Sequence, residues 1–202
     1  MLEQDLSEIL KMKVQSPFSI PMIMHKISDE HADEVENEFL KVESQFEKSE
    51  MLNTCLNDIK ETIFDPTSIS SFMQQLHTVR QKFYDLSKIS HNPESLHFWT
   101  QDYLEGDGQI AHHHGTVGIS GIYWIRADEG CSETVFHNPN PMFDYIPMDY
   151  GEISTPNFFQ LSRMVLTPVK GTFVFFPSYL KHEVLMNPAD KKRTTLSFSF
   201  GL

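Results

Sequence analysis

The chain has 202 residues, 40% of them hydrophobic and 22% charged, a composition typical of one folded domain and not of a disordered or fibrous protein. Sixteen basic against 28 acidic residues give a net charge of −12, which disfavours a nucleic-acid or membrane-surface partner because phosphate groups are also negative. The two cysteines, Cys55 and Cys131, are too few for a disulfide framework, and the acidic N-terminus lacks a signal-peptide pattern, so we expect a soluble cytoplasmic protein with no membrane segment.

Two amphipathic helices are expected within the first 92 residues. After Ser28, apolar side chains recur at helical steps, and two acidic residues follow in the first turn, where they suit the helix dipole. A second helical pattern runs from Ile69 to Leu86, between Pro66 and Pro93. We expect residues 1–92 to form a helical segment that braces the domain behind it and not an independent domain.

Residues 93–202 have the pattern of a β domain. Short runs of β-branched and aromatic residues alternate there with Gly, Pro, Asn and Asp. The predicted strands are Leu96–Leu104, Gln109–His113, Thr116–Arg126, Thr134–His137, Ser162–Thr167, Gly171–Phe176, His182–Met186 and Arg193–Phe200. Eight short strands favour a barrel or a jelly roll. Residues 138–156 hold four prolines, and we expect them to form a long loop over one mouth of the barrel.

Three histidines are the candidate metal ligands. Because residues two apart in a strand point to the same side, His112 and His114 can converge on one ion, while His113 points away. A barrel can place His182, at the start of another predicted strand, beside them. Three ligands on one side of an ion leave open positions for substrate or oxygen, as in non-heme Fe(II) oxygenases. Taken alone, the three consecutive histidines 112–114 also fit a surface cluster of histidines.

The surrounding motifs extend this pattern. Tyr103-Leu-Glu-Gly106 has its Tyr nine positions before His112, and Ile119–Trp124 reads Ile-Ser-Gly-Ile-Tyr-Trp. An apolar run ending at Pro177 precedes His182, and Arg193-Thr-Thr195 begins eleven positions after His182. In these motifs residues 96–202 resemble the Fe(II)- and 2-oxoglutarate-dependent dioxygenases, especially their prolyl-hydroxylase-like and phage-type branches. The resemblance implies a double-stranded β-helix, a jelly roll of the cupin-like kind.

The resemblance also implies the cofactors and the reaction. Fe(II), 2-oxoglutarate as cosubstrate and O2 are implied, with hydroxylation of a C–H bond in a peptide or small-molecule substrate and release of succinate and carbon dioxide. His112, His114 and His182 are then the metal ligands, and His114 replaces the Asp of most relatives. Arg193 is implied to grip the far carboxylate of 2-oxoglutarate, because a guanidinium provides a fixed, two-pronged cation.

Three other residues are implied to touch the cosubstrate or lie beside it. The hydroxyl of Thr195 and the phenol of Tyr103 are expected to assist Arg193. Trp124 stands where many relatives place a Tyr that contacts 2-oxoglutarate. The iron and the cosubstrate carry the chemistry in such enzymes, while the protein positions and shields them.

Three alternatives are compatible with the sequence. A register with His113 as first ligand puts Gly115 at the carboxylate position, as in halogenases, although the Tyr103 spacing and strand alternation disfavour it. A three-His cupin-type dioxygenase would bind its substrate directly on iron without 2-oxoglutarate. A jelly-roll binding module would have no catalytic activity at all.

Overall fold

The structure is a computed structural model that describes residues 20–43, 47–51, 60–63, 66–87, 96–115, 118–140, 162–188 and 190–201. Most of the predicted loop 138–156 lies outside the described residues, as does Cys55. No helix in the described part of the chain is long and apolar enough to span a membrane.

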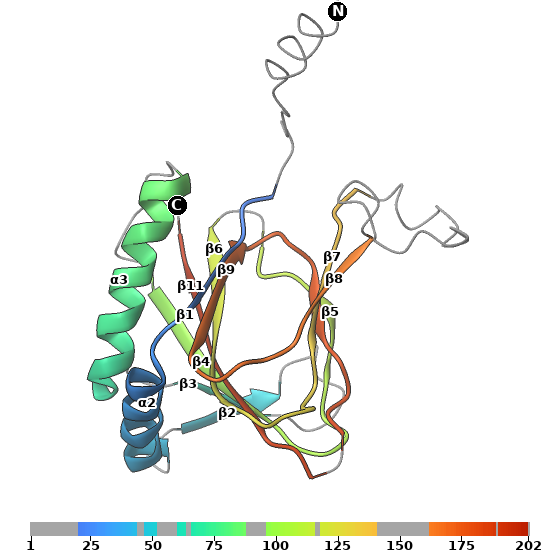
Figure 1. Cartoon of the computed structure of the whole chain (residues 1–202). Helices are drawn as coiled ribbons and strands as arrows, with labels where there is room; N and C mark the ends of the chain where they lie inside the picture. Colours follow the sequence, from blue (N-terminus) through green and yellow to red (C-terminus); the bar gives the residue numbers. More distant parts are fainter. Residues whose placement is uncertain are drawn as a thin grey trace, which may run out of the picture.

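Two antiparallel sheets lie opposite each other and enclose the interior of a jelly roll (Figure 1). The larger sheet has the order β1 (Ile23–Lys26), β9 (Thr172–Pro177), β6 (Ile119–Ala127), β11 (Arg193–Phe200), β4 (Leu96–Tyr103), β3 (Lys60–Ile63) and β2 (Glu47–Met51). The smaller sheet has the order β5 (Gln109–His112), β10 (His182–Val184), β7 (Thr134–His137) and β8 (Arg163–Leu166). The predicted fold class is confirmed, and all eight predicted strands are present, β7 and β11 with the predicted bounds.

Strands β1, β2 and β3 lie within residues 1–92, where the sequence predicted only helices. Their short sequences, Ile-Met-His-Lys, Glu-Lys-Ser-Glu-Met and Lys-Glu-Thr-Ile, are partly charged and have little intrinsic strand propensity. They form because a neighbouring strand offers free backbone groups: β1 pairs with β9, and β3 pairs with β4. Tertiary pairing therefore decides the structure of these segments.

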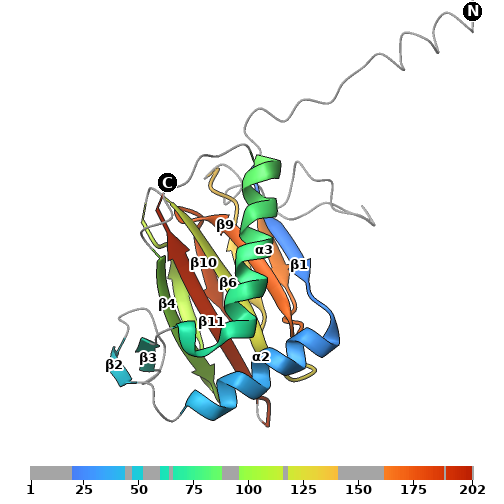
Figure 2. The same cartoon turned by 90° about the vertical axis from the view of Figure 1, so that its left-hand side faces the viewer.

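Both expected helices are present and cover the outer face of the larger sheet (Figure 2). Helix α2 (Asp29–Val42) begins after Ser28, whose hydroxyl accepts a hydrogen bond from the backbone N–H of His31. Helix α3 (Ser70–Ser87) follows the short 3-10 helix η2 (Pro66–Ser68). Phe72 of α3 stacks on Phe173 of β9 at 5.8 Å between ring centroids. The main apolar core therefore lies between these helices and the larger sheet.

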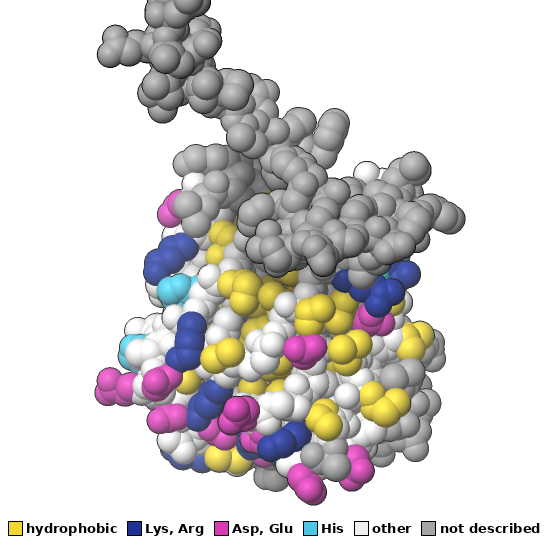
Figure 3. Space-filling model, turned by 45° about the vertical axis from the view of Figure 1, so that its right-hand side comes forward, with side chains coloured by type: hydrophobic (Ala, Val, Ile, Leu, Met, Phe, Trp, Pro, Cys, Tyr) yellow, Lys and Arg dark blue, Asp and Glu magenta, His cyan; other side chains and the backbone are white. Residues whose placement is uncertain are grey.

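The smaller sheet has no described helix on its outer face. Figure 3 shows the side of the molecule that carries this sheet, with apolar side chains scattered among acidic and basic ones. Ile110 of β5 and Val165 of β8 are about half exposed there. Among the described residues, helices therefore cover the larger sheet, whereas side chains of the smaller sheet are exposed.

Strand β11 separates the apolar core from a polar interior. Its alternate residues Leu196, Phe198 and Phe200 belong to the core beneath the helices. Arg193, Thr195 and Ser197 alternate with them, are buried, and line a pocket between the two sheets. Buried polar side chains are costly unless they have partners, so this row indicates a functional site.

Candidate metal centre

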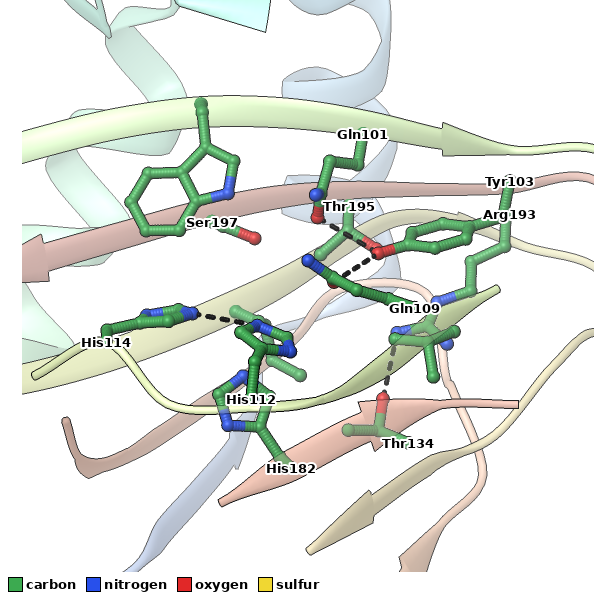
Figure 4. A pocket seen from close by; sticks show the side chains of 13 residues that line it. Gln101, Tyr103, Gln109, His112, His114, Thr134, His182, Arg193, Thr195 and Ser197 are labelled. Atoms are coloured by element: carbon green, nitrogen blue, oxygen red, sulfur yellow. Dashed lines mark hydrogen bonds between the residues drawn. The ribbon is translucent and has the colours of Figure 1, made fainter. Parts of the chain in front are cut away.

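The structure brings the three predicted histidines together, although they come from two distant parts of the chain (Figure 4). His112 ends β5 and lies directly opposite His182 of β10 in the antiparallel pair. His114 follows two residues beyond the end of β5. One ring nitrogen from each of the three lies within 4.8 Å of the other two. In the described residues the cluster contains no carboxylate.

Hydrogen bonds hold each ring so that one nitrogen faces the centre. Nδ1 of His112 lies 2.8 Å from the carbonyl oxygen of Ile110, and Nδ1 of His182 lies 2.9 Å from that of Leu180. A carbonyl oxygen can only accept, so both Nδ1 atoms carry the proton and both Nε2 atoms keep a free lone pair. Such partners orient metal-binding histidines in general.

Burial keeps the triad uncharged at neutral pH. Desolvation first, and the neighbouring imidazoles second, lower the pKa of His114 to about 4 and that of His182 to about 3. The pKa of His112 is also lowered, again mainly by burial. Neutral imidazole is the form that binds metal ions, so the site is prepared for a cation.

The nitrogen positions fit one metal ion. Nε2 of His112 and Nε2 of His114 are 3.2 Å apart. Two nitrogens that each lie about 2.1 Å from one ion at a right angle are separated by about 3 Å. Three imidazoles suit Fe, Zn or Cu, and the absence of thiolates among them argues against Cu(I) and Fe–S clusters. The residues present therefore fit Fe(II), with three neutral ligands in place of the usual two histidines and one Asp.

Arg193 lies at the other end of the same pocket and is 1% exposed. Its guanidinium donates hydrogen bonds to the carbonyl oxygen of Ser132 at 2.9 Å and to Oγ1 of Thr134 at 2.8 Å. Its Cζ also lies 4.9 Å from the centroid of the Tyr103 ring. Burial lowers the pKa of Arg193, but an arginine stays charged at neutral pH. No carboxylate in the described part of the chain pairs with it, so a buried cation faces the pocket without an anion.

Three polar atoms at this end of the pocket, one of them in the guanidinium itself, have no hydrogen-bond partner among the described residues. These atoms, Nε of Arg193, Oγ1 of Thr195 and Nε2 of Gln101, are all buried. All three can donate a hydrogen bond, and all three residues line the pocket. Unpaired buried donors are rare and costly, so this cluster indicates a missing acceptor-rich anion.

One pocket connects the triad with Arg193. Its lining contains the predicted residues His112, His114, His182, Arg193, Thr195 and Tyr103. Trp124 is also buried but does not line the pocket; its ring centroid lies 6.0 Å from Cζ of Arg193. Its indole belongs to an apolar cluster with Ile122 and Phe176.

Gln101 and Gln109 are pocket residues that sequence reasoning missed. The hydroxyl of Tyr103 lies 3.0 Å from Oε1 of Gln101 and 3.1 Å from Oε1 of Gln109. Gln101 is two positions before Tyr103 in β4, so strand alternation places both side chains on one face of the sheet. This alternation could have predicted Gln101 from the sequence. Gln109 had no comparable signal, because β5 and β4 belong to different sheets and its approach to Tyr103 depends on how those sheets face each other.

Comparisons with known proteins agree with this geometry. Residues 97–199 match the family model described as "Putative 2OG-Fe(II) oxygenase", whereas no curated protein matches the chain. A Pseudomonas putida prolyl-4-hydroxylase superposes with a TM-score of 0.64 at 12% identity, covering 91% of this chain and 93% of that one.

Two further solved structures have the same fold. A Trichoplax adhaerens prolyl hydroxylase, in complex with a peptide fragment of hypoxia inducible factor, gives a TM-score of 0.61 at 13% identity, covering 90% and 83% of the two chains. The non-heme alpha-ketoglutarate-dependent epimerase SnoN from nogalamycin biosynthesis gives a TM-score of 0.62 at 10% identity, covering 89% of this chain and 76% of that one. At such low identities these similarities establish the jelly-roll fold of this chain and nothing finer.

Proposed function

Since this chain belongs to the 2OG-Fe(II) oxygenase family, we propose that it hydroxylates a C–H bond of a peptide or small-molecule substrate. The observation that carries the proposal is one pocket with a histidine triad at one end and a buried, anion-free guanidinium at the other. The similar structures include two prolyl hydroxylases, one of them with a peptide bound, and also an epimerase. Hydroxylation and the substrate class are therefore the parts of this proposal that go beyond the family assignment.

In this proposal His112, His114 and His182 hold Fe(II) through their Nε2 atoms. Their Nδ1 partners hold the three rings in place around the ion. When bound, Fe(II) together with 2-oxoglutarate and O2 supplies oxidative decarboxylation to succinate and carbon dioxide, and the oxidising power to attack a C–H bond. Phe136 and Phe176 lie against His182, at 5.6 and 4.9 Å between ring centroids, and keep water from that side of the triad.

Arg193 is assigned to the far carboxylate of 2-oxoglutarate. Its unpaired Nε and the unpaired hydroxyl of Thr195 would donate to that carboxylate, and the ring of Tyr103 supports the guanidinium from one side. A bidentate, charge-assisted contact of this kind both binds the anion and fixes its direction. The keto-acid end of the cosubstrate is then directed toward the triad at the other end of the pocket.

The test is succinate formation from 2-oxoglutarate by the Fe(II)-loaded protein, with and without candidate substrates. We expect Arg193→Ala to lose at least about 2 kcal/mol of carboxylate binding, about thirtyfold in KM for 2-oxoglutarate. Arg163→Ala removes an exposed arginine from β8 and serves as the control, with unchanged KM. Full turnover by Arg193→Ala would refute the assignment.

A second candidate function follows from the absence of a carboxylate in the triad. A three-His dioxygenase that binds its substrate directly would consume O2 without 2-oxoglutarate, and its rate would not depend on Arg193. The unpaired donors around Arg193 favour the first proposal, because a direct-binding mechanism gives them no acceptor.

A further inference from the structure

The Nδ1 partner of His114 differs in kind from those of the other two histidines. Nδ1 of His112 and Nδ1 of His182 face backbone carbonyl oxygens, whereas Nδ1 of His114 lies 3.0 Å from the hydroxyl oxygen of Ser120. That hydroxyl is 2.9 Å from the hydroxyl oxygen of Ser178. A carbonyl oxygen only accepts, but a hydroxyl can donate or accept. His114 is therefore the one member of the triad whose partner leaves both neutral tautomers open.

We propose that the buried Ser120–Ser178 pair is a tautomer switch that positions His114 for metal binding. In the metal-free protein, Ser178 donates to Ser120, Ser120 donates to Nδ1 of His114, and the proton of His114 is on Nε2. In the metal-bound protein the chain runs the other way, with Nδ1–H of His114 donating to Ser120 and Ser120 donating to Ser178. This inference rests on the proposed function only in that the triad binds a metal.

The distance between two ring nitrogens supports the switch. Nε2 of His112 has a free lone pair, because its Nδ1 donates to the carbonyl of Ile110. Nε2 of His114 is only 3.2 Å from it. Two lone pairs that converge at this distance repel, and a proton or a cation between the two nitrogens relieves the repulsion. The Nε2–H tautomer of His114 supplies that proton, and a metal ion replaces it.

The imidazole of His114 carries one proton in both states. On metal binding one proton leaves Nε2 and one arrives at Nδ1, while the two hydroxyl groups rotate and keep their own protons. The net charge of the ring is zero before and after. His112 and His182 need no such change, so they form a permanent pair of ligands and His114 completes the site.

The backbone fixes the two serines at the required distance. Ser120 in β6 is fully buried, and Ser178 is 2% exposed. The N–H of His114 donates to the carbonyl of Ser178 at 2.9 Å, and the N–H of Ser178 donates to the carbonyl of Gly118 at 3.0 Å. Gly118 has a φ of +123°, and a Cβ there would lie 2.8 Å from the carbonyl oxygen of Phe200. The loop that carries His114 is thus pinned to the serine pair.

Nuclear magnetic resonance of the imidazole nitrogens tests the tautomers directly, with Zn(II) as a diamagnetic probe. We expect the metal-free protein to show Nδ1–H for His112 and His182 but Nε2–H for His114. After addition of Zn(II), all three should be Nδ1–H. Observation of Nδ1–H on His114 in the metal-free protein would overturn the proposal.

Zinc affinity, measured by competition with a chromogenic chelator, tests the role of the serines. Ser120→Ala should weaken zinc binding by about tenfold or more, as loss of a hydrogen-bond partner of a ligand commonly does, and Ser120→Thr, which keeps the hydroxyl, should restore much of it. Ser178→Ala, the second variant, should weaken it less. Ser71→Ala is the control: it removes another buried hydroxyl, which donates to Glu38 at 2.8 Å far from the triad.

Unchanged zinc affinity in Ser120→Ala would contradict the switch, as would an equal loss in Ser71→Ala. Neither measurement uses 2-oxoglutarate, oxygen or turnover. A protein that fails to oxidise 2-oxoglutarate but shows the two tautomers would therefore refute the proposed function and leave this inference intact.

Discussion

At the level of single residues, two neighbouring threonines in β11 have different roles. We assign Thr195 to ligand binding and Thr194 to the stability of the fold. The hydroxyl of Thr195 is buried in the pocket without a partner, whereas that of Thr194 donates to Asp102 at 2.5 Å on the other face of the sheet. The two residues are adjacent, so the pleat alone places their hydroxyls in different surroundings.

Thr195→Val should impair binding of 2-oxoglutarate without destabilising the protein. In the ligand-free protein this hydroxyl is buried but has no hydrogen-bond partner, so burying it costs free energy. Its removal should therefore leave the free energy of unfolding equal or raise it. Loss of one hydrogen bond to a carboxylate should raise KM for 2-oxoglutarate about tenfold. Thr194→Val, the matched control, should lower stability by about 1 kcal/mol and leave KM unchanged. The assignment of Thr195 fails if Thr195→Val lowers the free energy of unfolding in urea and leaves KM unchanged, while Thr194→Val raises KM.

The buried histidines should make the metal-free protein sensitive to acid. The pKa of His182 is about 3 in the folded protein and about 6.5 when unfolded. Between these values the unfolded chain binds more protons, so the free energy of unfolding falls as pH falls. From pH 7 to pH 5 His182 alone should cost about 2 kcal/mol.

Urea titrations of wild type and His182→Asn at pH 7 and pH 5, in the presence of a chelator, measure this effect. Wild type should lose about 2 kcal/mol more than the variant over this interval. Equal losses in both proteins would show that His182 is not buried as a neutral group.

At the level of elements, the turn after β10 supports Arg193 through Asn187. This asparagine is 1% exposed; its Oδ1 accepts from the N–H of Ser132 at 2.7 Å, and its Nδ2 donates to the carbonyl of Tyr103 at 2.9 Å. The carbonyl of Ser132 in turn accepts from Arg193. Asn187 therefore connects the segments that hold the guanidinium.

Asn187→Ala should lower both stability and cosubstrate affinity. Several buried backbone groups lose their partner, which should cost about 2 kcal/mol or more in the free energy of unfolding. KM for 2-oxoglutarate should rise because Ser132 no longer fixes Arg193. Asn138→Ala, which removes an exposed turn contact with Asn140, should change neither quantity. Unaltered KM in a folded Asn187→Ala protein would limit Asn187 to a structural role.

How far the sequence predicts these elements depends on how local their determinants are. The strands that surround the site were predictable because their alternation is a property of a few consecutive residues, and β11 has the predicted bounds. The triad was predictable from the spacing of His112 and His114 and from the motifs around His182. Strands β1, β2 and β3 were not, because backbone pairing with β9 and β4 creates them.

The supporting contacts of the site were beyond prediction for a related reason. Ser120 and Ser178 are 58 residues apart, and nothing local to either serine indicates that their hydroxyls meet behind His114. Asn187 reaches Tyr103 across 84 residues. Such contacts depend on the relative placement of the two sheets, which short-range patterns do not determine.

At the scale of the whole molecule, the N-terminal region and the β domain share one core. Lys170 pairs with Asp33 and Glu36, and Arg126 pairs with Glu36 and Glu43, so α2 is tied to the larger sheet by charge as well as by packing. We propose that residues 1–92 brace residues 93–202 and do not form a separate domain. The site then lies in the same cooperative unit as the helices, and ligands that bind it should stabilise the entire chain.

Thermal unfolding should show this linkage and the order of binding. A ligand present at 100 times its Kd adds about 2.7 kcal/mol, which for a chain of this size raises Tm by about 5 to 10 °C. Zn(II) should therefore raise Tm in wild type and in Arg193→Ala alike, because the triad does not include the arginine. Added 2-oxoglutarate should raise Tm further in metal-loaded wild type but not in Arg193→Ala. If 2-oxoglutarate raises Tm equally with and without metal, the triad and Arg193 do not bind one ligand together. The assignment of one pocket to iron and 2-oxoglutarate would then be wrong.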